Sequence, residues 1–172
     1  MKLVQWVRFT WDLDKLPPLA TALPDHYHFA GATDAEQKEL HAVIARSFAL
    51  DTSWGDAMQE VNRIIDRSLT EAFTRKSGIC LTLRHGLRII GAAVAFADPL
   101  VENHLSPGPC VLMEYRNRGL GTALLGEALR KLRDAGLAQV GALAKSNAPA
   151  ARFLYPKFNG ILVPDDTPLL AA

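Results

Sequence analysis

The sequence predicts a single domain of the α+β class (mixed α/β), in which about seven short strands and about four helices share one core. Its 172 residues suit one domain, which would bury roughly 70% of the surface that the unfolded chain exposes. Runs rich in β-branched and aromatic residues alternate with segments whose apolar residues recur at helical spacing. No internal repeat, low-complexity segment or linker divides the chain, so we expect residues 1–172 to form one domain.

The composition is that of an ordinary globular protein that recognises its substrate through a local site. Hydrophobic residues make up 49% of the chain and charged residues 22%, and a net charge of +1 indicates neither nucleic-acid nor membrane binding. No window approaches the roughly 18 apolar residues of a membrane span, and the start of the chain lacks the apolar stretch of a signal peptide. We therefore expect a cytoplasmic location.

The two cysteines, Cys80 and Cys110, lie in apolar runs that predict strands. Neither has histidines at the spacing of a zinc site, so we expect no metal. Free cysteine is usually buried, which favours two reduced thiols, although a disulfide stays open at this point.

Two strands and two helices are expected in the first half of the chain. Residues 2–11, rich in Val, Trp, Phe and Thr, predict one strand, and residues 26–31 predict a second. Thr33 and Glu36 have the spacing of a capping box, which places the start of a helix there. Another helix is expected over about 56–75. The apolar faces of the two helices are formed by Leu40, Val43, Ile44 and Phe48 and by Met58, Val61, Ile65, Leu69 and Phe73.

The second half of the chain begins with a predicted hairpin. Residues 79–83 and 87–96 are apolar runs separated by His85 and Gly86, and glycine supplies the positive φ that a tight turn needs. The remaining elements follow a proline-rich loop: a strand over 110–115, a helix from Leu120 that Gly136 ends, a strand over 139–144, a short helix over 148–154 and a strand over 161–163.

The junction between the strand over 110–115 and the next helix predicts a phosphate-binding site. The first N–H groups of a helix have no internal partner and carry the positive end of the helix dipole. Gly119 and Gly121 let the backbone approach an anion, and Arg116 and Arg118 add charges that can pair with phosphate oxygens. The rival interpretation is a structural turn with solvated arginines.

Other known phosphate loops match this turn less well. A P-loop would end in Gly-Lys-Ser/Thr, which is absent, and a dinucleotide fingerprint would need a third glycine where Leu124 stands. The remaining pattern, Arg116-x-x-Gly119-x-Gly121, resembles the pyrophosphate-binding motif of the GNAT acetyltransferases, usually written Arg/Gln-x-x-Gly-x-Gly/Ala. Residues 109–163 and 27–50 also resemble the core of that family.

The resemblance implies the GNAT acyl-CoA acyltransferase fold, with a central mixed, mostly antiparallel sheet of about six or seven strands flanked by about four helices. Residues 1–25 would be an extra N-terminal strand and loop beside the usual core. The sheet would splay between the strands over 110–115 and 139–144 and hold the pantetheine arm there. The residues implied to bind coenzyme A (CoA) are Cys110, Val111, Arg116, Asn117, Arg118, Gly119, Leu120, Gly121, Thr122 and Asn147.

The family transfers an acyl group from acetyl-CoA, its co-substrate, directly to an amine without a metal. A backbone N–H of the strand over 110–115 would polarise the thioester oxygen, and Tyr155 would protonate the departing thiolate. In many relatives that tyrosine lies one residue nearer to the asparagine, so a local distortion is needed to restore the orientation of Tyr155. Pro156 also disfavours helical geometry at Tyr155.

No general base is predicted. An amine with a pKa near 10 must lose a proton before it attacks. Some relatives use a glutamate on the strand before the asparagine, where this chain offers Ala142 and Ala144. The nearby titratable residues are Asp98, Glu102, His104 and Glu114, and solvated loop or turn positions are the simpler interpretation of each. Of these, Glu114 has the best motif position.

Three functions stay open on the sequence alone. The first is transfer of an acetyl (acyl) group from acetyl-CoA to a primary amine of a small molecule, amino acid or protein, by direct attack in a ternary complex. The second is a non-catalytic acyl-CoA-binding or sensing module of the same fold, and the third is a different nucleotide-binding α/β protein. The acceptor, a small-molecule or peptide amine, depends on loops over 12–25, 50–57 and 98–109. Homodimers are common in the family.

Overall fold

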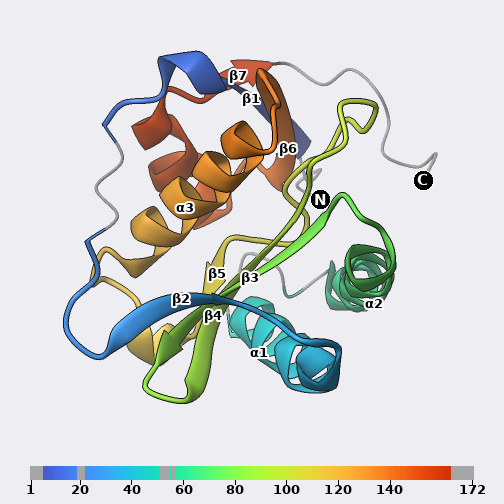
Figure 1. Ribbon diagram of the computed structural model, residues 1–172, viewed down its shortest axis with the longest axis vertical. Helices are drawn as coiled ribbons and strands as arrows, with labels where there is room; N and C mark the ends of the chain where they lie inside the picture. The colour runs from blue at the N-terminus through green and yellow to red at the C-terminus, as the bar shows by residue number, and fades with distance from the viewer. Residues whose placement is uncertain (1–5, 19–21, 51–54, 56, 164–172) are drawn as a thin grey trace.

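The computed structural model describes residues 6–18, 22–50, 55 and 57–163 and confirms the α+β prediction (Figure 1). Within these residues the strands are β1 (Trp6–Asp12), β2 (Tyr27–Gly31), β3 (Gly78–His85), β4 (Arg88–Phe96), β5 (Cys110–Val111), β6 (Gln139–Lys145) and β7 (Ile161–Val163). The helices are α1 (Gln37–Ala49), α2 (Met58–Thr74) and α3 (Leu120–Asp134). Shorter turns are the 3₁₀ segments Leu13–Lys15, Asp34–Glu36, Met113–Tyr115 and Tyr155–Phe158 and the π-helical segment Ala150–Leu154.

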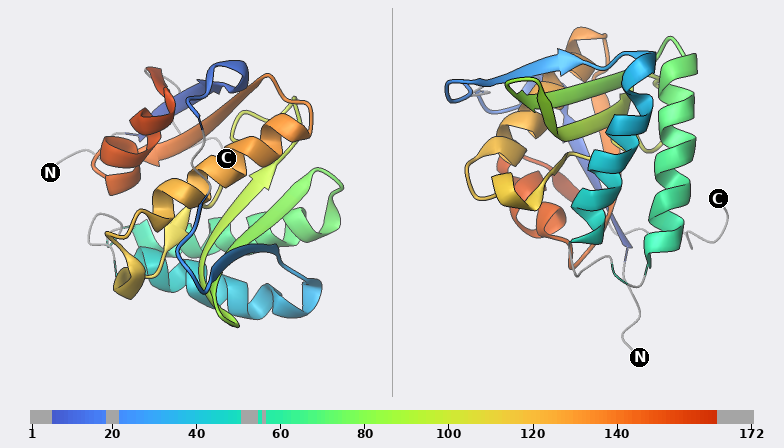
Figure 2. Two further views of the ribbon diagram at one scale, coloured as in Figure 1. Left: turned by 60° about the vertical axis from the view of Figure 1, so that its left-hand side comes forward. Right: turned by 90° about the horizontal axis from the view of Figure 1, so that it is seen from below.

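Strands β2, β3, β4 and β5 form an antiparallel sheet in that order, and helices cover both of its faces (Figure 2). The β3–β4 hairpin turns at Gly86, whose φ of +60° confirms the predicted tight turn. Along β4, Ala92 and Val94 pack with α1 and α2, whereas Ala93 and Ala95 face the core that includes α3. Because β4 is buried on both faces from Ile89 onward, that part of its sequence is continuously apolar instead of alternating with polar residues.

Strand β1 is the central strand of the second sheet, which has the order β6-β1-β7 with both pairings antiparallel. Its alternate residues Val7, Phe9 and Trp11 are buried in the core shared with α3. The N-terminal strand, expected to be extra to the usual family core, is therefore internal to the core of this chain.

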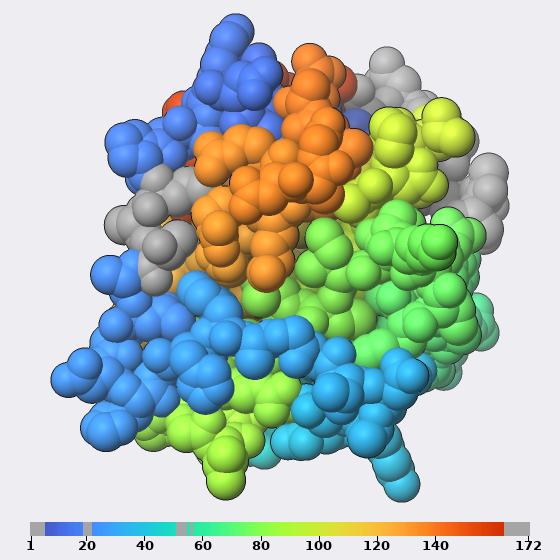
Figure 3. Space-filling model, viewed as in Figure 1, coloured from blue at the N-terminus to red at the C-terminus, as the bar shows by residue number. Residues whose placement is uncertain are grey.

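Helix α3 buries one side and shows the other at the surface, where the space-filling view places it near β2 (Figure 3). The apolar residues predicted at helical spacing are all buried, namely Leu120, Leu124, Leu125, Ala128, Leu129 and Leu132. On the other side Arg130 forms ion pairs with Glu127 and Asp134. None of the helices in the described ranges combines the length and the apolar character needed to cross a membrane.

The two sheets meet at His104 and separate at β5. The His104 N–H donates to the Gly141 carbonyl of β6 (2.8 Å), while the Phe96 N–H of β4 donates to the His104 carbonyl (2.9 Å). The chain then follows β4 through Ser106 to β5, which pairs with β4 alone in the described residues. This missing pairing between β5 and β6, called the split below, lies where the resemblance puts the pantetheine arm.

The strand predicted over 110–115 is too long. Strand β5 ends at Val111, and the Tyr115 N–H donates to the Leu112 carbonyl (2.9 Å), which closes a 3₁₀ turn. A short run of apolar and aromatic residues fits either structure, and the backbone bonds that decide between them are invisible in a sequence pattern.

The helix ends are partly as predicted. Thr33 and Glu36 do not form a capping box, because their side chains contact one another (3.3 Å) and the Glu36 carboxylate pairs with Arg84 of β3. The predicted end of α3 is confirmed: Gly136 has a φ of +98°, and its N–H donates to the Arg133 carbonyl (2.9 Å).

Candidate active site

Helix α3 begins at the predicted glycine-rich turn. Gly119 is the N-cap with a φ of +75°, and Asn117 is also left-handed with a φ of +63°. The first bond within the helix runs from the Ala123 N–H to the Gly119 carbonyl (3.1 Å), so the N–H groups of residues 120–122 have no partner within the helix. No acidic side chain lies in this first turn, which leaves the positive end of the helix dipole without a local counter-charge.

The space beside this turn is open at both glycines. A Cβ atom placed on Gly119 or Gly121 would meet no heavy atom within 4 Å. Gly119 needs glycine because of its positive φ, whereas Gly121 is distinguished by the open space alone. An anion can therefore approach the unpaired N–H groups at the start of α3.

Both arginines of the turn are engaged with protein groups. Arg116 donates from Nε to the Val111 carbonyl (3.0 Å) and from Nη2 to the Ser47 carbonyl (2.8 Å), which ties the turn to β5 and α1. Arg118 is more exposed, and its Nη1 donates to the Tyr27 hydroxyl (3.4 Å). For Arg116, the interpretation as a solvated side chain is wrong, because its two partners are backbone carbonyls.

Strand β5 presents one backbone residue to the split. The Leu112 N–H donates to the Ile90 carbonyl of β4 (2.8 Å), and backbone groups alternate in direction along a strand, so those of Val111 face away from β4. The Val111 carbonyl already accepts a side-chain hydrogen bond, which leaves its N–H on the unpaired edge. Cys110 pairs with Ala92, and burial raises the pKa of its thiol to about 11.

Tyr155 is buried beside β1 and reaches the loop before β5. Its ring packs edge-on against Phe9 and Trp11, with ring centroids 5.2 and 5.1 Å away. Its hydroxyl donates to the Gly108 carbonyl (3.3 Å). Burial, and then the negative charge that Cys110 can carry, raise the pKa of Tyr155, so the hydroxyl keeps its proton at physiological pH.

A π-helical turn sets the direction of Tyr155. Its N–H donates to the Ala150 carbonyl, one residue further back than in an α-helix. The turn therefore accommodates one extra residue, which is the kind of distortion that the displaced tyrosine requires. Pro156 is expected to disfavour helical geometry at Tyr155, but Tyr155 has helical φ −60° and ψ −39°. Pro156 lies in the first turn of a separate 3₁₀ segment, where its missing N–H is not needed.

Asn147 lies in the turn that connects β6 to the π-helical segment. The Ala148 N–H donates to the Lys145 carbonyl (3.0 Å) and closes this turn. The Asn147 side chain is exposed, in contrast to Lys145, which is buried. The amide of Asn147 is thus accessible to a ligand from outside the protein.

His104 is a buried structural residue, so its interpretation as a solvated loop residue is wrong. Its Nδ1 accepts from the Gly141 N–H (3.0 Å), which leaves Nε2 to donate to the Asp98 carbonyl (3.0 Å). Burial lowers the pKa of His104 despite these bonds. With both ring nitrogens engaged, His104 joins the loop to β6 and has no free nitrogen for proton transfer.

The two glutamates considered as bases are both paired with arginines. Glu114 lies 3.1 Å from Arg88 and 3.8 Å from Arg46, and a hydrogen bond from its own backbone N–H, followed by these charges, lowers its pKa. Glu102 is exposed and pairs with Arg8 (3.4 Å). A carboxylate with a lowered pKa is a weak base, so the structure does not favour Glu114 for deprotonating an amine, although Glu114 has the best motif position of the four candidates.

Within the described residues, no three His, Cys, Asp or Glu side chains lie close enough together to hold a metal ion. Cys80 and Cys110 are both free thiols and both partly buried. Burial raises the pKa of Cys80 to about 11, which keeps it protonated and unreactive.

Three residues that the structure brings to this region were not predicted from the sequence. Phe9 and Trp11 surround Tyr155 from the N-terminal strand, and Lys157 places its Nζ 3.3 Å from the Thr122 hydroxyl in the first turn of α3. The only sequence signal for Lys157 is its position two residues after Tyr155, and no local pattern connects β1 with the C-terminal segment.

Comparison with known proteins agrees with this geometry. The chain matches the model of the acetyltransferase (GNAT) family over residues 42–160. No curated protein matches the sequence. The structure is similar to a GCN5-related N-acetyltransferase from Sphaerobacter thermophilus, with a TM-score of 0.64 and 17% identity over 94% of this chain and 50% of that one.

Two other solved structures resemble the chain to a similar degree. One is a GNAT-family protein from Novosphingobium aromaticivorans, with a TM-score of 0.58 and 17% identity over 95% of this chain and 62% of that one. The other is a tandem GNAT protein from the clavulanic acid biosynthesis pathway, with a TM-score of 0.57 and 20% identity over 86% and 47%. The chain thus spans 47% to 62% of the length of these three relatives, and at such identities the likeness shows the fold alone.

The family model covers most of the chain and includes the turn at the start of α3, strand β6 and Tyr155. The same segments carry the motif resemblance, and the fold around them is that of the solved relatives. The chain belongs to the acetyltransferase (GNAT) family.

Proposed function

We propose that this protein transfers an acetyl group from acetyl-CoA to a primary amine of a small molecule, an amino acid or a protein, by direct attack in a ternary complex. The observation that carries the proposal is the start of α3, where unpaired N–H groups, two glycines beside open space and a first turn without acidic residues meet in a GNAT-family chain. These features suit the diphosphate of CoA.

The split suits the rest of the acyl-CoA molecule. The diphosphate would accept hydrogen bonds from the N–H groups of residues 120–122, and the pantetheine arm would run along the unpaired edge of β5. There the Val111 N–H is free to polarise the thioester carbonyl. Asn147, exposed at the end of β6, would bond the arm from the opposite side.

Tyr155 is proposed as the proton donor. The amine nitrogen attacks the thioester carbon, the carbon–sulfur bond breaks, and the departing thiolate takes a proton from the Tyr155 hydroxyl, which solvent then restores. Because the pKa of Tyr155 is raised, the donor is protonated whenever substrate binds. The amine loses its own proton to water in this scheme, since Glu102 and Glu114 are both paired with arginines.

A second candidate is a non-catalytic acyl-CoA-binding or sensing module of the same fold, and it is favoured by the lack of an evident general base among the described residues. Ala142 and Ala144 stand where some relatives carry a glutamate, and both are buried in β6. Glu114 is held by arginines at a lowered pKa. A protein that binds acyl-CoA tightly but releases no free CoA with any amine would be this module.

Thermal unfolding with and without excess acetyl-CoA tests the cofactor first, with ATP and NAD as controls. A ligand at about 100 times its Kd adds about 2.7 kcal/mol of stability, which corresponds to a rise in Tm of roughly 5–10 °C for a chain of this size. A shift with acetyl-CoA alone would support the proposal, and an amine screen that detects free thiol would follow. A shift with ATP or NAD and none with any CoA species would contradict it.

A further inference from the structure

Lys157 brings a positive charge to the start of α3 from the C-terminal side of the split. It lies in the 3₁₀ turn that begins at Tyr155, and its Nζ is 3.3 Å from the Thr122 hydroxyl in the first turn of the helix. Within the described residues, Thr122 is the one hydrogen-bond or ion-pair partner of this ammonium group. The charge of Lys157 is therefore not neutralised by a carboxylate of the described chain.

A cation at this position is electrostatically unfavourable in the protein alone. The N-terminal end of a helix carries partial positive charge, which attracts anions and repels cations. The first turn of α3 has no acidic residue, and the acidic side chains further along, Glu127 and Asp134, are already paired with Arg130. An anion bound between Lys157 and residues 120–122 would be attracted by both positive groups and would remove their repulsion.

Arg116 is committed to two backbone carbonyls of the protein. Its side chain is partly buried, and Nε and Nη2 donate to the carbonyls of Val111 and Ser47. Moving the guanidinium to a phosphate would break both bonds and leave two carbonyl acceptors without donors. The same bonds tie the turn to β5 on one side and to the last turn of α1 on the other.

We propose that Lys157, and not Arg116, supplies a side-chain charge that binds the diphosphate of acyl-CoA, while Arg116 is a positioning residue that holds the turn in place. The assignment rests on the proposed function, because it concerns the ligand of that same site. Lys157 lies outside the glycine-rich motif, and tertiary structure alone brings it to the start of α3.

Isothermal titration calorimetry with CoA, dephospho-CoA and pantetheine tests the role of Lys157. We expect Lys157→Gln to raise the Kd of CoA and of dephospho-CoA alike, by about 5-fold at low ionic strength, as the loss of an exposed ion pair predicts. Binding of pantetheine, which lacks the diphosphate, should not change. Lys157→Arg should recover most of the affinity, and added salt should weaken the wild-type protein more than Lys157→Gln.

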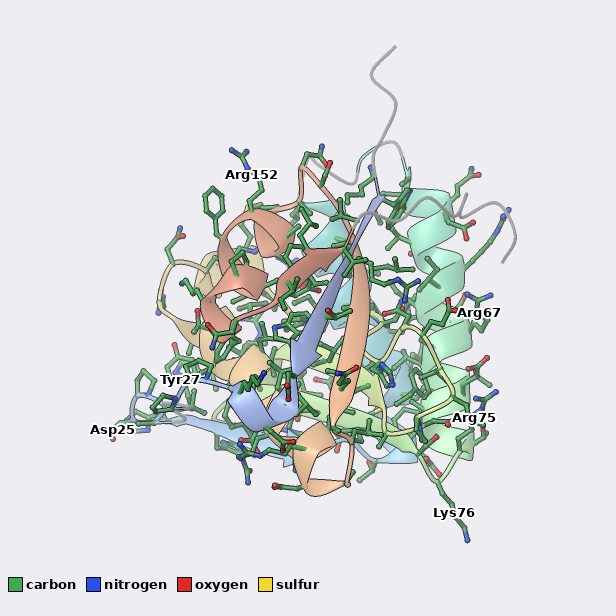
Figure 4. The ribbon with its side chains drawn as sticks, turned by 90° about the horizontal axis from the view of Figure 1, so that it is seen from above. Asp25, Tyr27, Arg67, Arg75, Lys76 and Arg152 are labelled. Atoms are coloured by element: carbon green, nitrogen blue, oxygen red, sulfur yellow. The ribbon has the colours of Figure 1, made fainter. Side chains whose placement is uncertain are left out.

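Lys76→Gln is the matched control, because it removes the same charge from an exposed lysine. Lys76 follows α2, and Figure 4 shows it projecting on the other side of the molecule from Arg152 of the π-helical turn. An unchanged Kd in Lys157→Gln, or an equal loss in Lys76→Gln, would overturn the assignment. A loss with CoA that is absent with dephospho-CoA would also overturn it, because Lys157 would then bind the 3′-phosphate. If the wild-type protein binds none of the three ligands, the proposed function fails instead.

Amide hydrogen exchange of the ligand-free protein tests the role of Arg116. We expect Arg116→Gln to speed exchange in the turn, in the first turn of α3 and in the last turn of α1, because the side chain no longer joins them. Arg116→Lys should exchange more slowly than Arg116→Gln but faster than the wild type, since an ammonium group cannot reproduce both hydrogen bonds of the planar guanidinium. Exchange unchanged from the wild type, together with weaker CoA binding, would make Arg116 a direct ligand contact and refute the positioning role.

Discussion

Replacing Gly121 by glutamate is expected to stabilise the protein and at the same time to prevent cofactor binding. Gly121 lies in the first turn of α3, its φ is not in the left-handed region, and a Cβ there would meet no heavy atom within 4 Å. The substitution therefore fits without steric conflict. It also places a carboxylate beside the unpaired N–H groups where the diphosphate is proposed to bind.

The magnitude follows from two terms. Glycine costs about 0.8–1 kcal/mol relative to a good helix former inside a helix, and a position in the first turn realises part of that. A carboxylate at the N-terminal end of a helix adds about 0.3–1 kcal/mol. Together they predict a gain of roughly 1 kcal/mol, which is a rise in Tm of about 2–4 °C for a chain of this length.

Thermal unfolding of three variants with and without acetyl-CoA measures both effects. Gly121→Glu should melt higher than the wild type and lose the shift with acetyl-CoA, while Gly121→Ala should melt higher and keep it. Gly119→Ala should melt lower, because its φ of +75° disfavours any side chain. A Gly121→Glu protein that keeps the full shift would refute the placement of the diphosphate, and one that melts lower would refute the open space at this position.

Three further predictions concern Tyr155, His104 and Trp11. Tyr155→Phe should lower kcat by about 100-fold or more, which is the range for a general acid, with the Kd of acetyl-CoA nearly unchanged. An unchanged kcat in steady-state kinetics would show that Tyr155 has no catalytic role. Because the folded-state pKa of His104 lies below the ordinary value of 6.5, the unfolded chain takes up a proton first as the pH falls. The free energy of unfolding, measured with urea, should thus decrease below about pH 6.5. The decrease should be smaller in His104→Gln, because a glutamine amide does not take up a proton in this pH range. Trp11→Ala should lower the free energy of unfolding by about 3–5 kcal/mol, since Trp11 is 1% exposed and lies in β1, the central strand of the second sheet. A loss under about 1 kcal/mol would contradict the central position of this strand.

Local features of the chain were predictable because each depends on neighbouring residues. Gly86 between two apolar runs predicts a tight turn, and the turn occurs there. The helical spacing from Leu120 and the glycine at position 136 predict both ends of α3. The strand–turn–helix junction with Gly119 and Gly121 predicts unpaired N–H groups beside open space, which the structure contains.

Features that depend on residues far apart in the sequence were predicted less well. The buried position of His104 results from its bonds to Gly141, and the two carbonyl partners of Arg116 come from α1 and β5. A loop histidine and a loop arginine look the same in sequence whether solvent or protein surrounds them. The direction of Tyr155 depends on a π-helical turn whose extra residue no periodicity indicates.

The sequence by itself determined the class of fold, the family and the location of the glycine-rich turn at the start of α3, because periodicity, glycine conformation and motif spacing act over a few neighbouring residues. Only the tertiary structure decided that β1 lies at the centre of the second sheet, that Arg116 holds the turn and that Lys157 reaches the start of α3. These depend on which strands pair and which side chains meet across the split. Such contacts are set by the burial of the whole core and by the geometry of long-range hydrogen bonds, which no local pattern encodes.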